Sequence, residues 1–351
     1  MLGFILALSL YLNKFLLLID IIAVTEMESE DNMTASLQVF ESVLAFSLVV
    51  VSCIIMKRKS IVQEEDAALC ARLLTQAALP AFIFFQLSTH PVSGRQFLMV
   101  LAMIVTGILS MGAAWLAGKS LRLERPKIGA LMLTSSFGST ALIGYPLIQF
   151  SFPNNPAALT DAILLSELGV GLPIFILGPA VAMYFGENFD ENIGTRWSVF
   201  TEYFRSPIFF ATVLGLIIAP FQIPVNNWLV APFYEALSVI GNAVAVLACL
   251  ILGLQLKMKS LKGIWALFII SALIQMVFQP WVAHMQADLY RLSAEQTQVL
   301  TLISSLPAAV LGSVFATHYK CASDTASALI MMHLLLAIVL VPLTFAVLNT
   351  T

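Results

Sequence analysis

Charged residues are scarce in this chain of 351 residues, where Asp, Glu, Lys and Arg together make up 11%. Soluble globular domains carry about 25% charged residues, whereas 60% of this sequence is hydrophobic. The scarcity of charge therefore excludes an ordinary soluble domain. It predicts an all-α polytopic membrane protein whose main partner is the lipid bilayer, because helices satisfy their backbone polar groups within lipid.

Motifs of several other protein classes are missing as well. The four cysteines are scattered, without a CxxC pair or a histidine at ligand spacing, so we expect reduced packing residues and no metal site. No HExxH, GxxxxGKS or GxxxxGKT motif is present, which argues against a metalloprotease and an ATP-driven pump. Lysine and arginine form no cluster with interleaved aromatic residues, so nucleic acid is not an expected partner.

Ten hydrophobic segments follow residue 36, and each is long enough to cross a bilayer as a helix of about 20 residues. A further apolar segment, residues 1–24, is either an additional span or an interfacial helix, and an acidic linker follows it. The ten predicted spans are residues 37–56, 67–88, 97–118, 129–152, 157–185, 207–223, 234–256, 263–284, 298–317 and 325–348.

Lysine and arginine alternate from one connection to the next. Fourteen of them lie in or beside every second connection, and the intervening connections hold only Arg95 and Arg291. The positive-inside rule places the lysine-rich connections in the cytoplasm. We therefore expect a multi-pass protein of the plasma membrane, most simply a bacterial inner membrane, with its C-terminus outside.

Two of the spans, at 129–152 and 298–317, combine helix-breaking glycine and proline with hydroxyl side chains. Irregular backbone at membrane depth is tolerated only where it lines a cavity or is buried in protein. Paired broken segments in two halves of a chain are typical of a secondary transporter site; the alternative is that glycine and proline only kink packed helices. The candidate substrate-binding residues are Gly138, Ser139, Thr140, Ala141, Gly144, Pro146, Pro307, Ala308, Ala309, Gly312 and Ser313.

Backbone amides at these breaks suit an anionic substrate. A helix N-terminus presents unpaired amides and about half a positive charge, which binds anions without a fixed countercharge. We expect this at residues 138–141 and 307–310, all of which except Pro307 have an amide to donate.

The second half of the chain repeats the pattern of the first. The Ser135–Ser136 pair in the fourth span matches the Ser304–Ser305 pair in the ninth. Because each half has five spans, an odd number, the second half is predicted to be inverted, with binding at the midplane between the repeats. The predicted units are an N-terminal extension and linker (1–36), a first five-helix repeat (37–185), a cytoplasmic linker (186–206) and a second five-helix repeat (207–351).

Three residues inside the predicted spans are candidates for ion or proton coupling, namely Glu167, His333 and Asn242. A charged side chain at the bilayer centre costs about 2.5–3.5 kcal/mol on insertion scales, so the default interpretation of Glu167 is functional. The alternatives are that Glu167 is a structural carboxyl bonded to a hydroxyl, that His333 is a core histidine with its hydrogen bonds satisfied, and that Asn242 is an amide that joins helices. Asp161 and Asp324 are expected to cap the fifth and tenth helices.

Four stretches, in this order and spacing, carry a resemblance to the auxin efflux carrier family, whose bacterial members include malate- and malonate-type organic-acid permeases. They are Leu79–Pro80, residues 142–146, Ser206–Pro207 with Gly215, and residues 306–310. Two positions depart from the family pattern: Ser139 stands where many members have asparagine, and Leu311 where a polar residue often stands.

The resemblance implies a fold like that of bile-acid symporters, with ten helices in two inverted repeats and broken fourth and ninth helices that cross at the centre. It also implies that helices 1, 2, 6 and 7 form a scaffold, through which two copies dimerise. Helices 3–5 and 8–10 would form a transport bundle. Members that resemble this chain move small organic anions by an elevator-like alternation.

The residues and the resemblance together predict a secondary active transporter, or permease, for a small organic anion such as a mono- or dicarboxylate. We expect coupling to protons or sodium, as in a symporter, and no other cofactor. An enzyme is not expected, because an intramembrane aspartyl protease would need a second carboxylate beside Glu167. The alternative is a sensor or channel built on a transporter fold, although a channel would favour a continuous polar pore.

Overall fold

The computed structural model describes residues 30–63, 65–90, 92–153, 155–186, 204–221, 227–255 and 264–350. Over these ranges the regular structure is helical, and extended pairing is limited to one antiparallel bridge. Seven described helical segments are long and apolar enough to cross a membrane, and Pro207–Phe221 is a shorter apolar helix. The prediction of an all-α polytopic membrane protein is confirmed. The predictions for residues 1–24 and for most of the 186–206 linker lie outside the described residues.

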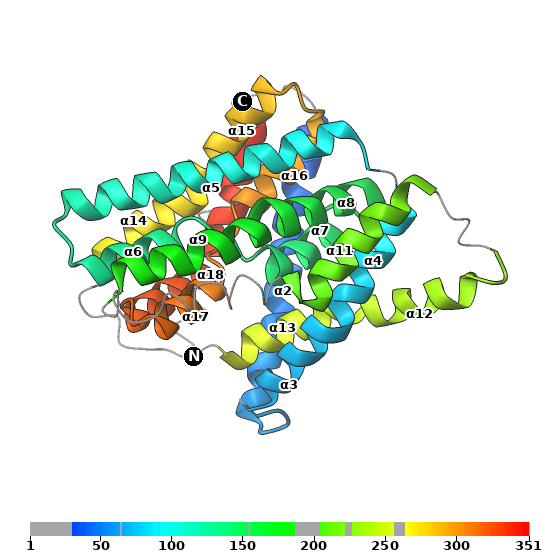
Figure 1. Cartoon of the computed structure of the whole chain (residues 1–351), viewed down its shortest axis with the longest axis horizontal. Coiled ribbons are helices and arrows are strands. Elements are labelled where there is room, and N and C mark those ends of the chain that lie inside the picture. Colours follow the sequence, from blue (N-terminus) through cyan, green and yellow to red (C-terminus); the bar gives the residue numbers. More distant parts are fainter. Residues whose placement is uncertain are drawn as a thin grey trace.

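The described helices follow the predicted spans, and several spans consist of two helices in succession (Figure 1). The helices are α2 (Glu30–Arg58), α3 (Asp66–Leu73), α4 (Leu79–Thr89), α5 (Gly94–Ser120), α6 (Arg125–Thr134), α7 (Tyr145–Ser151), α8 (Pro156–Leu164), α9 (Leu172–Phe185), α11 (Pro207–Ile218), α12 (Ala231–Gly241), α13 (Ala243–Gln255), α14 (Trp265–Leu273), α15 (Gln279–Leu289), α16 (Ala294–Ser304), α17 (Leu311–His318) and α18 (Ser323–Thr350).

Proline explains four π-helical turns that precede α4, α7, α9 and α15. Proline lacks an N–H, and its ring clashes with the carbonyl four residues earlier, so a wider turn relieves the clash. The carbonyl of Met276, four residues before Pro280, instead accepts a hydrogen bond from Thr344 Oγ1 at 3.0 Å. The turns are Leu74–Ala78, Thr140–Gly144, Leu165–Gly171 and Ile274–Phe278, and the second residue of each following helix is Pro80, Pro146, Pro173 or Pro280.

The helices form two groups that meet along an apolar boundary. On one side α4 packs against α11 and α12, and α13 packs against α3; α5, α6, α9 and α14 lie on the other side (Figure 1). An apolar cluster spans the boundary and contains Phe82 of α4 together with Val100 of α5 and Tyr145 of α7. A polar contact also joins the groups, because Gln86 Nε2 of α4 donates to the carbonyl of Pro156 in α8 at 2.8 Å.

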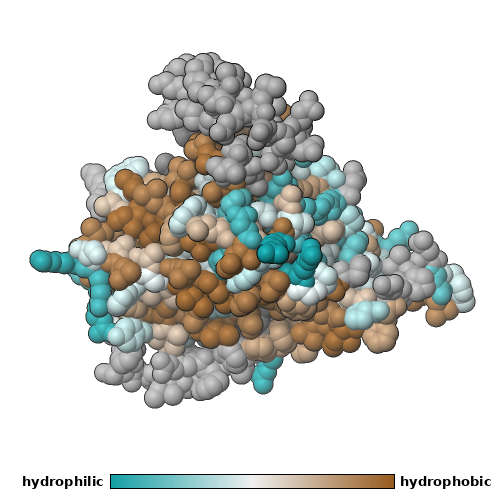
Figure 2. Space-filling view, turned by 90° about the horizontal axis from the view of Figure 1, so that it is seen from above, coloured by the Kyte–Doolittle hydropathy of each residue, from teal (hydrophilic) through white to brown (hydrophobic). Residues whose placement is uncertain are grey.

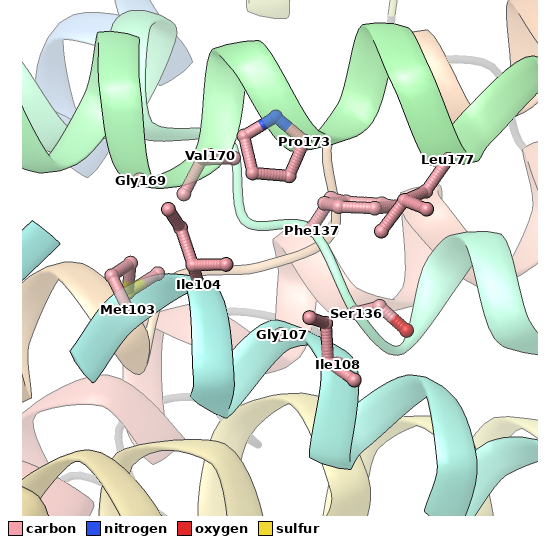
Figure 3. Close-up of a pocket in the computed structure, with 10 residues that line it drawn as sticks. All are labelled: Met103, Ile104, Gly107, Ile108, Ser136, Phe137, Gly169, Val170, Pro173 and Leu177. Atoms are coloured by element: carbon pink, nitrogen blue, oxygen red, sulfur yellow. The ribbon is translucent and has the colours of Figure 1, made fainter. Parts of the chain in front are cut away.

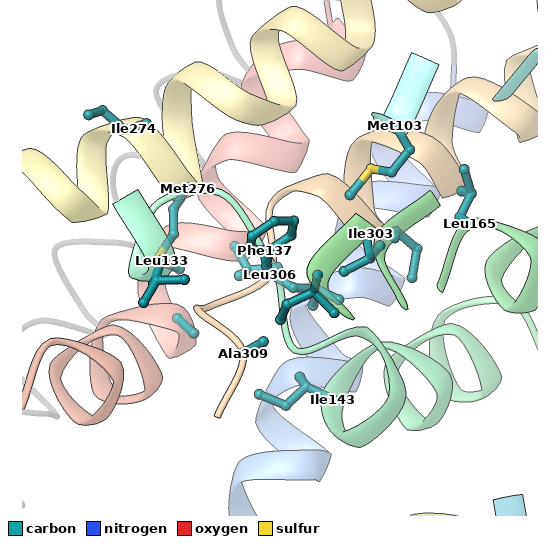
Figure 4. Close-up of a cluster of buried hydrophobic side chains, with 14 of the residues drawn as sticks. Met103, Leu133, Phe137, Ile143, Leu165, Ile274, Met276, Ile303, Leu306 and Ala309 are labelled. Carbon is teal, nitrogen blue, oxygen red and sulfur yellow. The ribbon is translucent and has the colours of Figure 1, made fainter. Parts of the chain in front are cut away.

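Two helical segments break where they cross. α6 ends at Thr134 and helical structure resumes at Thr140; α16 ends at Ser304 and α17 begins at Leu311. The extended stretches between these helices run antiparallel to each other. Figure 4 shows that the side chains of Phe137 and Leu306, from the two stretches, lie at the centre of a buried apolar cluster. The crossing is therefore packed inside the protein.

The outer surface of the helices is apolar, as lipid-facing side chains require. Ile108, Leu214 and Ile269 are each about half exposed, on α5, α11 and α14. Figure 2 shows apolar side chains over much of one face of the molecule. Polar residues are buried around the crossing, among them Ser135, Ser136, Ser304 and Ser305.

The prediction that Asp161 caps the fifth helix is wrong. α8 is capped by Asn155, whose side chain accepts a hydrogen bond from the amide of Ala158 at 3.2 Å. Asparagine followed by Pro156 starts the helix earlier than expected, because proline is favoured at the first helical position. Asp161 then lies in the second turn, where it is buried and accepts a hydrogen bond from Gln96 Nε2 at 2.5 Å. Asp324 lies in the first turn of α18.

Candidate functional site

The candidate site is the crossing of the two extended stretches. The amides of Ser139 and Ala309 each donate to a carbonyl of the opposite stretch, at 2.8 and 2.7 Å. These bonds flank the bridge between Gly138 and Ala308, so the N–H groups of that pair point away from the partner stretch. Neither amide has a hydrogen-bond partner among the described residues. Beside the bridge two amides are thus occupied, contrary to the expectation that all were available, and the amides of the bridged pair point to opposite sides of the paired stretches.

The helix that resumes after the crossing adds further donors. The amide of Thr140 is occupied by a backbone carbonyl, and the next backbone bond begins at Ile143. The amides of Ala141 and Leu142 therefore have no partner within the described part of the chain, as is usual in a first helical turn. A helix N-terminus carries about half a positive charge, so this end of the helix makes the crossing attractive to anions.

A chain of hydroxyl groups connects the crossing to Glu167. Thr140 Oγ1 lies 2.7 Å from Ser166 Oγ, which lies 3.3 Å from Glu167 Oε1. Tyr145 donates its hydroxyl to the same carboxylate oxygen at 2.5 Å. An ionised carboxylate only accepts hydrogen bonds, so Ser166 donates to Glu167 and accepts from Thr140. Glu167 is 5% exposed. Its hydrogen bonds to hydroxyl groups fit a structural carboxyl as well as a carboxyl that couples a proton to transport.

Two glutamines of the α14–α15 segment hold the crossing in place. Gln275 Nε2 donates to the carbonyl of Leu306 at 3.0 Å, and Gln279 Nε2 donates to the carbonyl of Ser136 at 3.1 Å. On the same segment, Ser271 hydrogen-bonds to the hydroxyls at the end of α6. All three side chains are completely buried. Each glutamine thus ties one of the two extended stretches to the same helical segment.

Two predicted glycines allow the broken helices to approach. A Cβ atom at Gly144 would lie 3.0 Å from side-chain carbons of Ile303 and Leu306, and one at Gly312 would lie 3.2 Å from a backbone carbonyl of α6. Pro146 is the second residue of α7 and accounts for the preceding π turn. Ser313 donates its hydroxyl to a carbonyl at the start of its own helix, at 2.8 Å, so that this hydroxyl is engaged within its own chain segment.

His333 and Asn242 lie apart from the Glu167 network. His333 is completely buried in α18, its ring centroid is 6.0 Å from that of Phe268, and neither ring nitrogen has a hydrogen-bond partner among the described residues. Asn242 is exposed at the junction of α12 and α13. The structure therefore brings Glu167 together with the crossing through hydrogen bonds and does not bring His333 or Asn242 into that network.

The crossing is closed in this conformation. Ser139, Thr140 and Ala309 are 6%, 5% and 8% exposed. A narrow cleft between α5 and α9 reaches Ser136 and Phe137, and its other lining residues are apolar or glycine (Figure 3). A charged solute would not pass such a lining, because an unpaired charge in apolar surroundings is costly. Access to the amides of Gly138 and Ala308 therefore requires movement of the helices.

Tyr145, Ser166 and the two glutamines of this site were not among the predicted site residues. Tyr145 and Ser166 are adjacent to predicted residues in sequence, but only the packing of α7 on the Leu165–Gly171 turn brings their hydroxyls to one carboxylate. The glutamines at 275 and 279 are interpretable from sequence as amides that join helices. The sequence pattern that could have indicated their contacts with the crossing is the presence of two amide side chains four residues apart in an apolar span.

Comparison with known proteins identifies a family. A family model described as "Membrane transport protein" matches residues 38–184 and 195–345. An uncharacterized transporter of Methanocaldococcus jannaschii is 27% identical over 266 residues, which cover 74% of this chain and 82% of the relative. An uncharacterized transporter of Methanothermobacter thermautotrophicus is 26% identical over 305 residues, which cover 86% of this chain and 96% of the relative.

Proposed function

This chain belongs to the membrane transport protein family, the auxin efflux carrier family that its motifs resemble, and we propose that it is a secondary active transporter for a small organic anion. The coarser conclusion, a multi-pass membrane transporter, follows from the family and from the seven apolar helices. The substrate class, the mechanism and the coupling ion are the proposal. The matched relatives are transporters too, by name.

The observation that carries the proposal is the set of amides around the crossing, at Gly138, Ala141, Leu142 and Ala308, that have no hydrogen-bond partner among the described residues. Gly138 and Ala308 offer neutral donors on opposite sides of the paired stretches, and the helix N-terminus after Gly138 adds the amides of Ala141 and Leu142 and a partial positive charge. Neutral donors bind an anion reversibly, which a carrier needs in order to release its substrate. A mono- or dicarboxylate, with planar oxygens that accept several hydrogen bonds, fits the amides of this helix N-terminus.

The packing supports an elevator-type division of the helices. We assign α2, α3–α4, α11 and α12–α13 to a scaffold, and α5–α9 with α14–α18 to a transport bundle. The boundary between them is formed largely by apolar side chains, which can slide without leaving polar groups unpaired. The hydrogen bond from Gln86 to Pro156 crosses it and would break on movement. The ten-helix inverted repeat and a dimer formed through the scaffold belong to the same proposal.

Aromatic and basic residues support the proposed orientation. Lys119 lies 4.2 Å from the centre of the Trp115 ring, and the guanidinium of Arg125 lies 5.3 Å from that of Tyr184. These pairs lie at the ends of α5 and α9 and the start of α6, where basic and aromatic side chains are typical of a membrane interface. We propose that this end of the bundle faces the cytoplasm and that the C-terminus lies outside.

A proton is the coupling ion that the hydrogen bonds favour over sodium. Glu167 is the buried carboxyl connected to the crossing, through Ser166 and Thr140. Gain or loss of a proton by Glu167 would change the hydrogen-bond direction along this chain of hydroxyls, because a protonated carboxyl also donates. The same group thereby links proton binding to the site that we assign to the anion.

A thermal-shift screen of the purified protein against small carboxylates tests the proposal. A ligand that binds only the folded state raises stability by RT ln(1 + [L]/Kd), about 2.7 kcal/mol at a hundredfold excess over Kd. Thr140→Val, which removes the hydroxyl that connects the crossing to Ser166 and Glu167, is expected to reduce the shift. Ser313→Ala is the matched control, because its hydroxyl is bonded within its own helix. No shift with any carboxylate would contradict the anion assignment and redirect the search to other solutes or to a sensor.

A further inference from the structure

We infer that Tyr145 transmits the protonation state of Glu167 to the contact between the transport bundle and the scaffold. This inference rests on the proposed function and adds to it a residue that couples the candidate proton site to domain movement. Tyr145 is the first residue of α7, five residues after Thr140, and its side chain is completely buried.

Tyr145 contacts both Glu167 in the proposed bundle and Phe82 in the proposed scaffold. Its hydroxyl donates to Glu167 Oε1 at 2.5 Å, within the bundle. Its ring centroid lies 5.6 Å from that of Phe82, with the rings tilted by 39°, and Phe82 belongs to α4 of the proposed scaffold. At this separation aromatic rings are in favourable contact. One side chain therefore connects the buried carboxyl to the surface along which the bundle would slide.

The side chains around Tyr145 at the boundary show how it differs from its neighbours. The cluster at the boundary is apolar, with Leu79, Phe82 and Ile83 on the scaffold side and Val100 and Tyr145 on the bundle side. Tyr145 differs from these neighbours because its hydroxyl is fixed by a partner within the bundle. The orientation of its ring is then set by a hydrogen bond as well as by packing.

The strength of that hydrogen bond depends on the charge of Glu167. A hydrogen bond to an ionised carboxylate is roughly twice as strong as one between neutral groups. With Glu167 ionised, the hydroxyl of Tyr145 is held and its ring stays against Phe82. With Glu167 protonated, the bond weakens and the ring is free to leave. Protonation is therefore expected to favour movement of the bundle along the scaffold.

Other ionisable groups on the surrounding elements do not replace Tyr145 in this role. The Leu165–Gly171 turn packs against α5, α8, α9, α16 and the Thr140–Gly144 turn. Asp161 of α8 is bonded to Gln96 instead, and the side chains that hydrogen-bond to Glu167 include Tyr145 and Ser166. The remaining ionisable side chains on these elements are Arg95 and Lys119 at the ends of α5, Tyr184 near the end of α9 and Glu295 in the first turn of α16.

Distance measurements between spin labels at acidic and alkaline pH test the inference without a known substrate. Labels at Leu229→Cys before α12 and Leu289→Cys at the end of α15 are suitable, because these side chains are 67% and 74% exposed. The half-buried Cys70 would be replaced by alanine. We expect the distance distribution to shift on acidification, Tyr145→Phe to lose this shift, and Glu167→Gln to show the acidic distribution at both pH values.

Tyr234→Phe is the matched control, because Tyr234 is also buried and its ring stacks near Phe84 within the scaffold. This variant is expected to keep the pH-dependent shift. A wild-type shift that persists in Tyr145→Phe would overturn the role of Tyr145, and so would a distribution that does not respond to pH in the wild type. The carboxylate-binding screen would be unaffected by either result, so that failure of this inference is distinguishable from failure of the proposed function.

Discussion

Substitution of Gly144 offers a graded test of the crossing. A Cβ at this position would lie 3.0 Å from Ile303 Cδ1 and from Leu306 Cδ1, and 3.7 Å from Thr140 Cβ. Carbon atoms are in optimal contact at about 3.5–4.0 Å, so the two δ-methyl groups must move by several tenths of an ångström. Both belong to the other broken segment. Gly144→Ala therefore presses directly on the opposite half of the crossing.

The expected cost can be worked out from these contacts. Each displaced side chain leaves its preferred rotamer at about 0.5–1.5 kcal/mol, so that two cost about 1–3 kcal/mol. Alanine in place of glycine within a helix returns about 0.5–1 kcal/mol. Gly144→Ala should thus lower the free energy of unfolding by about 0–2.5 kcal/mol, which is tolerable. Gly144→Leu adds three more carbon atoms that the same neighbours cannot accommodate, and it should separate the two stretches.

Transport of a carboxylate into proteoliposomes and thermal unfolding of the purified protein measure the two effects. Gly144→Ala is expected to remain folded with weaker transport, and Gly144→Leu to insert in the membrane without transport. Gly112→Leu in α5 is the control, because a Cβ there meets no atom within 4 Å. Wild-type transport by Gly144→Leu would refute the assignment of the packed crossing as the binding site.

Four further predictions follow from the same geometry. Glu167→Gln should flatten the pH dependence of transport, measured as initial rate against pH; an unchanged profile would return Glu167 to a structural role. Gln86→Leu removes the hydrogen bond from α4 to Pro156, so it should change the maximal transport rate more than the anion Kd, and a change in Kd alone would contradict the boundary assignment. Pro307→Leu should abolish transport with membrane insertion intact, as judged by flux and by expression in the membrane fraction. Burial raises the pKa of the Cys321 thiol to about 12. Because the thiolate is the reactive form, a maleimide should label Cys321 at neutral pH only after the protein unfolds. Labelling of Cys321 in the folded protein would disprove the burial of this thiol.

Helical segments and their interruptions were predictable because the signals are local. Runs of apolar residues mark the spans, and Pro146 and Pro307 mark interruptions because proline inside a helix removes a backbone hydrogen bond. The glycines at 138 and 144 likewise mark the crossing. Asp161 shows the limit of such signals, because the stronger pair of Asn155 and Pro156 began the helix earlier.

Hydrogen-bond partners were not predictable because they depend on the packing of distant segments. Tyr145 and Glu167 are 22 residues apart, and Gln275 reaches the carbonyl of Leu306 from another helical segment. The occupation of the Ser139 and Ala309 amides follows from the antiparallel register of the two stretches. Composition indicated that donors gather at the crossing. Only the register shows which amides bond to the partner stretch and which point away from it.

Counterflow in proteoliposomes tests the central claim most directly. Vesicles loaded with an unlabelled carboxylate that binds in the thermal-shift screen would be diluted into the same carboxylate in labelled form. A carrier with an alternating, closed crossing predicts saturable uptake that the internal carboxylate stimulates, and loss of this uptake in Gly144→Leu. Flux that rises linearly with concentration and ignores the internal carboxylate would indicate a channel, and would contradict the assignment of the crossing as the binding site of a carrier.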